Sequence, residues 1–526
     1  MSSAGDVELE FDVSRVELAA FAVATAVLAI VALPTTQSLL YGLFFGTPSV
    51  LQWGAVAAVI AAVGRARDAP LLYVLAVAVF VVLGLLVGPV VSGVYAHSRV
   101  ADELQSDATN LQTLPNTSAE HVRALPRSVA DNYAQSSMQY PQYRLTESDI
   151  AYRNGSYAWS YGVVPDNFLV ALLGNQHGAL YVDMTTTDKR VDVEETEFAT
   201  GRGQLVTDGY RYRSVLATPF KRHDWDTTFN ARANGTAYIA HSTTVYEWHF
   251  RAAPIPQLYA VPRHGSVEVM HTDGSIESLS PREARESPLL RGQNFYPYGL
   301  AMFDVESMQY VHGALNKWFW KEDVLAIADL PESGNEWPIV VPTEGAGPEL
   351  TYFVATEPTG TGNGVYEVWT VDGQSGAVGV QRYSESQIGP QKAVEFVERR
   401  PQVNRLSNAE AIAPAPVVRG DTLYWHVKVV SGSRSGVVYT AFVNAESGDV
   451  TLVEGTEPIY AFLRWSELDQ VPEPGKGQSG TTVTVVVTNA DGEIVDTRNV
   501  TVPAGGGVQV EVQDNQPTNA TAAGSG

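Results

Sequence analysis

Residues 71 to 94 read Leu71-Leu-Tyr-Val-Leu-Ala-Val-Ala-Val-Phe-Val-Val-Leu-Gly-Leu-Leu-Val-Gly-Pro-Val-Val-Ser-Gly-Val94, a stretch of 24 residues without a charged side chain. A helix of about 20 apolar residues crosses the hydrocarbon core of a bilayer. Whatever follows this stretch must fold on one side of a membrane. The stretch therefore predicts a transmembrane helix that divides the chain into an anchor and a large remainder.

Two further apolar stretches precede this helix, at residues 18–33 and 41–64. The first is just long enough to span when its flanking residues are counted. The second contains Pro48 and Gln52, so two alternatives stay open: a full span, or a shorter span from Val50 with a re-entrant start. Together with the third stretch they predict a bundle of three transmembrane helices within residues 16–95, which makes the lipid bilayer one partner of the chain.

The orientation follows from the arginines that flank the apolar stretches. Arg15 precedes the first stretch, and Arg65 and Arg67 lie between the second and the third. Positively charged residues stay on the cytoplasmic side. We therefore expect residues 1–15 to form a cytoplasmic tail and residues 96–526 to lie outside, in a multi-pass protein of a cell membrane or a viral envelope.

The charge of the 526-residue chain is strongly negative, with 58 acidic against 34 basic residues and a net charge of −24. Such a surface repels phosphates, so a nucleic-acid partner is not expected. The chain has no cysteine, which excludes disulfides and thiolate metal sites. Only 7 of the basic residues are lysines, a pattern that favours a protein working in high salt over an ordinary acidic surface protein.

Three segments beyond the membrane read alike: an aromatic-rich strand, a second strand ending in Val-Asp or Val-Asn, a polar turn and a third strand. Aromatic and β-branched residues suit a half-buried sheet, and Asp or Asn with Ser and Gly suits a tight turn. The segments are Tyr157-Ala-Trp-Ser-Tyr161 with Tyr181-Val-Asp183, Leu350-Thr-Tyr-Phe-Val354 with Trp369-Thr-Val-Asp-Gly-Gln-Ser-Gly376, and Leu423-Tyr-Trp-His-Val427 with Phe442-Val-Asn-Ala-Glu-Ser-Gly448. They predict an internal repeat of antiparallel meanders.

A helical pattern precedes each meander, at residues 118–134, 304–319 and 389–399, with Ser118 and Asp304 as capping candidates. The fold class is therefore α+β: three transmembrane helices, repeated helix-plus-meander units and a C-terminal β-hairpin. The expected parts beyond the membrane are a first unit at 96–190, a β-rich insertion at 191–300 with strands at 236–250 and 265–271, a second unit at 301–388, a third at 389–456, a linker at 457–480, and a hairpin with a disordered tail at 481–526.

The third unit combines the helix at 389–399 with Leu423-Tyr-Trp-His-Val427 and Phe442-Val-Asn-Ala-Glu-Ser-Gly-Asp-Val450. This combination resembles PepSY modules, which pair one helix with a short meander ending in a similar turn. The resemblance is best over residues 389–453. It implies an inhibitory or binding module outside the membrane, with a peptidase as the partner.

The best candidate for a binding site is the cluster Trp318-Phe319-Trp320. Three consecutive aromatic residues on a helix cannot all face one core, so at least one ring is expected to be exposed for a partner or ligand. The alternative is that the cluster fills the interface between its helix and the second meander. Five sequons are candidates for glycosylation, at Asn116, Asn154, Asn234, Asn499 and Asn519.

Catalytic patterns are weak. His223 with Asp224 and Asp226 is the densest polar cluster, although a solvated loop is the simpler interpretation. No metal motif, phosphate-binding loop or nucleophile elbow is present, so no metal or cofactor is expected. The favoured function is a noncatalytic binding or structural protein displayed at a cell surface or on an envelope, with another surface or envelope protein as partner. A peptidase regulator and a membrane-bound hydrolase are the alternatives.

Overall fold

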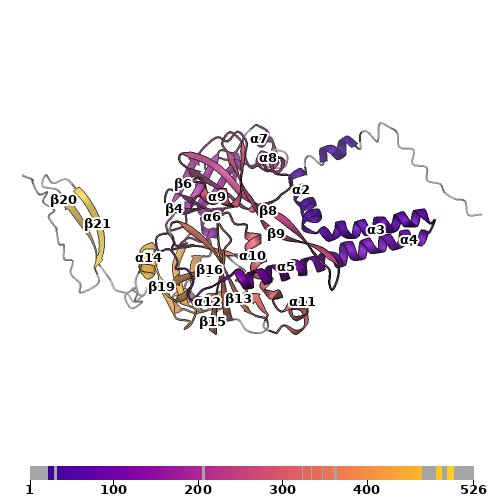
Figure 1. The fold of residues 1–526 in the computed structure, drawn as a ribbon. Helices are drawn as coiled ribbons and strands as arrows, with labels where there is room; N and C mark the ends of the chain where they lie inside the picture. Colours follow the sequence, from indigo (N-terminus) through magenta and orange to yellow (C-terminus); the bar gives the residue numbers. More distant parts are fainter. Residues whose placement is uncertain are drawn as a thin grey trace, which may run out of the picture. The chain divides into compact units, whose positions relative to one another are not determined.

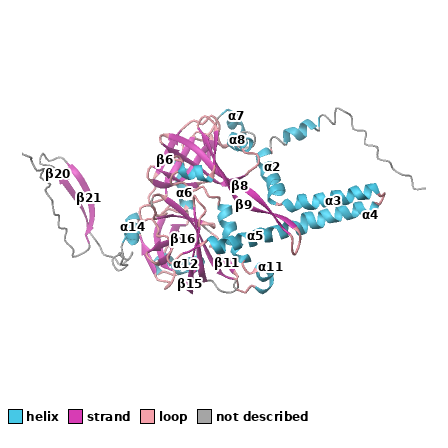
Figure 2. Ribbon diagram, in the orientation of Figure 1, coloured by secondary structure: helices cyan, strands magenta, loops and turns pink. Residues whose placement is uncertain are grey.

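The computed structural model describes most of the chain and divides it into two compact units, residues 1–472 and 473–526. The described residues are 20, 22–28, 32–173, 175–203, 208–322, 324–332, 334–345, 347–359, 364–464, 481–488 and 494–502. The expected cytoplasmic tail at 1–15, the larger part of the expected linker, and the C-terminal tail with Asn519 lie outside these residues. In the first unit an arm of apolar helices joins a body built of sheets and helices (Figure 1; Figure 2).

The arm contains two helices that are long and apolar enough to cross a membrane, Pro48–Ala66 and Pro70–Asp107, or three if a bent pair is one span. The bent pair is Ala22–Leu28 with Leu33–Gly46, which meet at 82°. The elements of the arm are α2 (Leu33–Tyr41), η1 (Gly42–Gly46), α3 (Pro48–Ala66), α4 (Pro70–Val79), η2 (Phe80–Val87) and α5 (Gly88–Asp107).

Proline determines where the second span begins. Pro48 occupies the first turn of α3, where a missing backbone N–H costs nothing. The shorter alternative for the second stretch is therefore the better one, with a start at Pro48 instead of Val50. The helix through residues 70–107 runs past residue 95, because nothing in Tyr95 to Asp107 breaks it. The expected boundary between anchor and outer region at 95/96 therefore falls within α5 and stays a prediction.

The first sheet of the body has five strands in the order β2-β4-β5-β6, with β3 beside β4. Its strands and helices are α6 (Arg127–Ser137), β2 (Tyr143–Leu145), β3 (Asp149–Arg153), β4 (Ser156–Pro165), α7 (Phe168–Leu173), β5 (Gly178–Asp183) and β6 (Val191–Glu195). Because β6 pairs with β5, the expected boundary at 190/191 cuts this sheet as well.

The insertion folds as a four-stranded antiparallel sheet in the order β10-β9-β8-β7. Its elements are α8 (Gly209–Ala217), β7 (Arg222–Ala233), β8 (Thr236–Arg251), β9 (Gln257–His271), β10 (Ile276–Leu279) and α9 (Pro281–Glu286). The hairpin β8–β9 is long enough to leave the body and lie along the arm, where β9 packs on α3 and α5 (Figure 1).

The third sheet is six-stranded and is antiparallel except for the short β1, which pairs with β15 in parallel. Its region contains β1 (Thr109–Asn110), α10 (Tyr298–Ser307), η4 (Met308–Tyr310), α11 (Gly313–Leu315), η5 (Asn316–Trp320), β11 (Leu325–Ile327), β12 (Ile339–Thr343), β13 (Glu349–Pro358), β14 (Gly364–Asp372) and β15 (Val378–Ile388). The predicted helix at 304–319 is therefore broken into short pieces, and Asp304 lies inside α10 instead of capping a helix.

The fourth sheet is an antiparallel meander in the order β16-β17-β18-β19. Its region contains α12 (Pro390–Glu398), α13 (Pro401–Asn404), β16 (Ala409–Arg419), β17 (Thr422–Ser431), β18 (Val437–Asn444), β19 (Val450–Val453) and α14 (Thr456–Arg464). A helix and a meander thus lie where the third unit was predicted, with one more strand, β16, than the pattern indicated. The resemblance to PepSY modules stays a prediction.

Two other expectations differ from the structure. The helix predicted from Ser118 begins only at Arg127, because Pro126 cannot lie inside a helix and residues 118–126 are irregular. Residues 457–464, assigned to a linker, form most of α14. The buried side chains of Ile459 and Phe462 pack on β17 and β18. The second unit contains the predicted hairpin, with β20 (Thr481–Thr488) antiparallel to β21 (Ile494–Val502).

The role of α14 gives a first prediction. The ring of Phe462 is fully buried, 3.8 Å from the ring of Phe442 and 5.1 Å from that of Tyr424. We expect Phe462→Ala to lower the free energy of unfolding by about 3–5 kcal/mol, through lost burial and the cavity that remains. The exposed Glu457→Ala in the same helix is the control. Equal thermal midpoints for the two variants would show that α14 is no part of the folded core.

Candidate functional site

The largest cavity described here, of about 500 Å³, lies where the first sheet, β7, α10 and the segment before β12 meet. Its size is that of a small-molecule site. The polar side chains that line it come from five distant segments of the chain. They are Arg123, Arg127, Ser128, Asp131, Ser148, Asp149, Asp226, Tyr298, Glu332, Asn335 and Glu336. The rings of Trp159 and Trp337 complete the wall.

Arg123 is the most unusual group of the cavity. Its side chain is 93% buried, and its Nη2 donates a hydrogen bond of 2.7 Å to the amide oxygen of Asn335. The guanidinium also lies 4.8 Å from the ring centroid of Trp159. Among the described residues no carboxylate forms an ion pair with it. Burial lowers the pKa of Arg123 to about 10, because water no longer solvates the charge.

A second buried cation lies behind Arg123. Lys428 on β17 is 99% buried, and its Nζ lies 3.1 Å from Nδ1 of His426 and 3.3 Å from that residue's carbonyl oxygen. Burial and the charge of Arg123 hold the pKa of Lys428 well below its usual value. In the described chain it too has no acidic partner. Two basic side chains thus share one buried region without a counter-ion.

Elsewhere in the body, buried charges are paired. Glu194, which is 7% exposed, is bonded by Arg153 at 3.2 Å and by Arg232 at 2.7 Å. The fully buried Glu268 has Nζ of Lys221 at 3.4 Å and accepts a hydrogen bond from Ser266. An unpaired buried charge is costly, whereas a paired one is tolerated. Arg123 therefore differs from Glu194 and Glu268, which each have an oppositely charged partner.

The opposite wall of the cavity is acidic. Asp149 at the start of β3 accepts hydrogen bonds of 2.7 Å from the hydroxyl of Tyr298 and from the backbone N–H of Ile150. Burial raises the pKa of Asp149 to about 7, although both bonds and the nearby Arg127 act in the other direction. Asp131 accepts a bond of 2.8 Å from Tyr161. The cavity thus offers a buried guanidinium together with hydrogen-bonding carboxyls.

This arrangement is suited to binding an anion. The guanidinium of Arg123 can form two parallel hydrogen bonds to a carboxylate. Its hydrogen bond to Asn335 fixes the orientation of the fork, and Asn335 is itself fixed by donating to the carbonyl of Pro414 at 2.8 Å.

The predicted binding cluster, Trp318, Phe319 and Trp320, lies away from this cavity, on η5. The three side chains are 45%, 72% and 65% exposed. Sequence reasoning expected at least one exposed ring, and the structure exposes all three. The alternative, that the cluster fills the interface with the second meander, is wrong, because a π-helical turn ended by Lys321 at a positive φ of 55° turns the rings outward.

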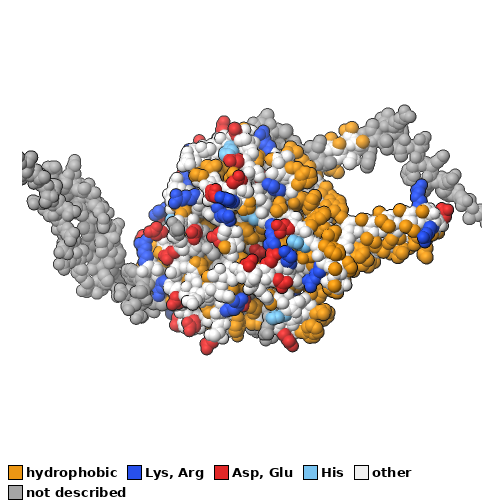
Figure 3. Space-filling view, viewed as in Figure 1, with side chains coloured by type: hydrophobic (Ala, Val, Ile, Leu, Met, Phe, Trp, Pro, Cys, Tyr) orange, Lys and Arg blue, Asp and Glu red, His pale blue; other side chains and the backbone are white. Residues whose placement is uncertain are grey.

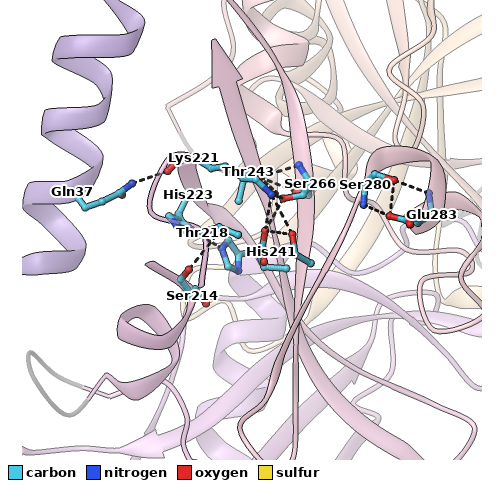
Figure 4. A network of polar contacts seen from close by, with 12 residues as sticks. Gln37, Ser214, Thr218, Lys221, His223, His241, Thr243, Ser266, Ser280 and Glu283 are labelled. Carbon is cyan, nitrogen blue, oxygen red and sulfur yellow. Dashed lines mark hydrogen bonds and ion pairs between the residues drawn. The ribbon is translucent and has the colours of Figure 1, made fainter. Parts of the chain in front are cut away.

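His223 is not on a solvated loop. It begins β7, is 97% buried, and its Nδ1 lies 2.9 Å from Nε2 of His241 on β8 (Figure 4). Nδ1 of His241 in turn lies 2.5 Å from the hydroxyl of Tyr210, and the ring of Trp225 stacks on both histidines. Burial lowers the pKa of His223 to about 4 and that of His241 well below 6.5, so both rings are neutral at pH 7. A chain of neutral rings links β7, β8 and α8.

The neighbouring acids do not join this chain as acid–base partners. Asp224 accepts a hydrogen bond of 2.6 Å from Thr244, and Asp226 lines the cavity. No group of three histidine or acidic side chains in the described part of the chain is arranged to hold a metal ion. Three predicted sequon residues, Asn116, Asn154 and Asn234, are exposed, the last two at turns with positive φ. Asn499 lies on β21.

A comparison with protein-family models finds no match, and neither does a comparison with curated proteins. The case for the cavity therefore rests on its own chemistry. Sequence reasoning missed Arg123 and Asp149, which stand in irregular or short segments without a pattern. Lys428 did carry a signal, because it lies between Val427 and Val429 in an apolar strand. A lysine inside a fully buried strand is rare and points to a special role.

The pKa of Asp149 gives a second prediction. Its folded-state pKa of about 7 lies above the ordinary 3.8, so the folded state holds a proton that the unfolded state releases. Stability from this group is full below pH 4 and is lost as the pH rises to 7, about 4 kcal/mol in all. Asp149→Asn keeps the acceptor for Tyr298 without the charge. We expect its thermal midpoint to exceed that of the wild type at pH 8 by more than at pH 4.

The control is Asp421→Asn, which replaces an exposed carboxyl in the turn before β17. Near-UV circular dichroism of the full chain in lipid nanodiscs follows the unfolding of all three proteins. Parallel pH profiles for wild type and Asp149→Asn would contradict the raised pKa.

Proposed function

We propose that the chain is a membrane-anchored, noncatalytic binding protein whose body takes up a carboxylate-bearing ligand in the Arg123 cavity. The single observation that carries this proposal is a buried guanidinium in a cavity of small-molecule size, with no acidic partner among the residues that the structure describes. A ligand carboxylate would supply the missing counter-ion. The acidic wall with Asp149 and Asp131 suits hydroxyl or amino groups on the same ligand.

Membrane anchoring is supported by the two long apolar helices and the bent pair. We further propose the finer topology: three spans, with the body outside. The turn between α3 and α4, at the end of the arm that points away from the body, carries Arg65 and Arg67 (Figure 3). Positive residues favour the cytoplasmic side, which leaves the body on the opposite side. The three meanders β4–β5–β6, β13–β14–β15 and β17–β18–β19 are compatible with a repeat origin.

The topology is testable because the chain has no cysteine of its own. Arg67→Cys places a thiol in the exposed turn between α3 and α4, and Glu120→Cys places one on the exposed surface of the body. We expect a membrane-impermeant maleimide to label Cys at position 120 on intact cells. Position 67 should react only after the membrane is permeabilised. The reverse pattern would overturn the orientation.

Ligand binding is tested through Arg123. We expect the thermal midpoint of the wild type to rise with millimolar amounts of at least one of four probes: acetate, glycine, glucuronate or inorganic phosphate. At a concentration a hundred times the dissociation constant the gain is about 2.7 kcal/mol. Arg123→Met should lose this response. A wild type that none of the probes stabilises would contradict the proposal, and a shift with phosphate alone would replace the carboxylate by a phosphoryl group.

Arg153→Met is the matched control. Both arginines are buried in the body, but Arg153 is paired with Glu194, while Arg123 has no acidic partner in the described chain. Arg153→Met removes one of the two arginines that bond the buried Glu194 and leaves Arg232 as its partner, so the free energy of unfolding should fall. Arg123→Met removes the hydrogen bond from a charged group to Asn335, which is worth about 1.5–3 kcal/mol, and also removes a buried charge, which acts in the opposite direction. The control should keep the response to the probe while its own stability falls.

A further inference from the structure

Two groups of exposed apolar side chains lie on the body close to the arm. The first, the hairpin tip, comprises residues 248–256 of the β8–β9 hairpin, where Trp248, Phe250 and Ile255 are 44%, 61% and 37% exposed. The second, the aromatic turn, comprises Trp318 to Trp320 on η5, with exposures of 45–72%. Figure 3 shows apolar side chains gathered on the side of the body from which the arm projects, continuous with the arm itself.

Helix α5 contacts both the hairpin and the segment that leads to the aromatic turn. The hydroxyl of Tyr95 donates a hydrogen bond of 3.1 Å to the carbonyl of Ile255 at the hairpin tip. The hairpin also meets earlier turns of α5, because Ser92 donates 3.4 Å to the carbonyl of Leu258 and the amide of Gln257 donates 3.4 Å to the carbonyl of Gly88. Further along α5, the ring of His97 stacks at 4.9 Å on that of Tyr310, eight residues before the aromatic turn.

These contacts lie on both sides of the end of the apolar spans. The uncharged stretch of residues 71–94 ends one residue before Tyr95. The hairpin tip also meets α3, because the amide of Gln52 donates 2.9 Å to the carbonyl of Pro256 and accepts 2.6 Å from the N–H of Leu258. Gln52 lies in the first turns of a helix of 19 residues, which is about 28 Å long and matches the hydrocarbon core.

The composition of the two groups is that of an interfacial belt. Tryptophan and other aromatic rings are enriched where the hydrocarbon core meets the headgroups, because one side of the ring is apolar and the other is wet. The indole N–H of Trp248 donates 2.8 Å to the carbonyl of Phe45 in η1, so the tip is bonded directly to the arm. Lys317 and Lys321 flank the aromatic turn and can reach anionic headgroups.

We propose that the body rests on the bilayer surface, with the hairpin tip and the aromatic turn inserted among the lipid headgroups. The proposal rests on the proposed membrane anchoring and adds a second mode of contact. The occupant of the two surfaces is lipid, because the hairpin tip is bonded to α3 and α5 beside their apolar faces, and both surfaces expose apolar rings on the side of the body from which the arm projects (Figure 3).

The test uses the full chain in nanodiscs of a phosphatidylcholine and phosphatidylglycerol mixture. Single cysteines replace Ile255, Phe319, Val82 and Val193, one in each variant, and carry an environment-sensitive fluorophore. Lipids with a nitroxide near the headgroup or in the middle of the acyl chain quench the fluorophore by depth. Val82 is an exposed residue of η2 in the apolar arm, and Val193 is an exposed residue of β6 in the first sheet. They serve as the buried-in-lipid and the water-exposed reference.

We expect labels at 255 and 319 to be blue-shifted and quenched most strongly by the headgroup nitroxide. The label at 82 should be quenched most by the acyl-chain nitroxide, and the label at 193 by neither. Quenching at 82 without quenching at 255 and 319 would overturn the docking but leave the anchoring intact. Loss of quenching at 82 would overturn the anchoring itself. A blue shift at 319 in native membranes without quenching in nanodiscs would assign the aromatic turn to a protein partner and overturn the proposal.

Discussion

The continuity of the helix from Pro70 to Asp107 is the constraint on which the first unit depends. In hydrocarbon every backbone N–H and C=O must be bonded within its own helix, so the span cannot end before the interface. Here the helix does not end at the interface either. Its last turns carry Tyr95, Ala96 and Val100 into a small core with Tyr259 and Val261 of β9. The body is therefore joined to the arm by packing, without an intervening linker.

Most of the buried acidic groups discussed above are either paired with a basic side chain or protonated. Glu194 and Glu268 are held by arginine and lysine partners, and Asp149 avoids its charge by keeping a proton up to about pH 7. Arg123 has no acidic partner among the described residues, and its guanidinium does not lose its charge at neutral pH. In a chain with a large excess of carboxylates, a missing acidic partner cannot be ascribed to scarcity. The proposed anion-binding role of the cavity rests on this difference.

Much of the fold could be predicted from periodicity, and the failures have identifiable causes. The strands β8 and β9 lie where alternation placed strands, and Pro48 marked the start of α3 as its fixed geometry requires. The helix at 304–319 was predicted wrongly because positive φ at Gly313 breaks it, which hydrophobic spacing does not reveal. Likewise the residues of α14 were assigned to a linker. Ile459 and Phe462 are buried only because the helix packs on the fourth sheet, and the local sequence does not show this contact.

The cavity could not be predicted at all, since its polar groups come from segments around residues 123–131, 148–159, 226, 298–302 and 332–340. Only tertiary structure brings Arg123, Asp149 and Asn335 to one place. The aromatic turn, in contrast, was visible as Trp318-Phe319-Trp320, because exposure of three consecutive rings follows from helix geometry alone. Local patterns reveal what a single element must expose, whereas a site assembled from distant elements leaves no local trace.

Helix α10 connects the wall of the cavity to α5. At its beginning the hydroxyl of Tyr298 bonds Asp149 in the cavity wall, and further along Phe303 and Ser307 contact the ring of His97 on α5. The helix has ten residues, about 15 Å of length. One short helix therefore sets the distance between Asp149 and the part of α5 that follows the uncharged stretch.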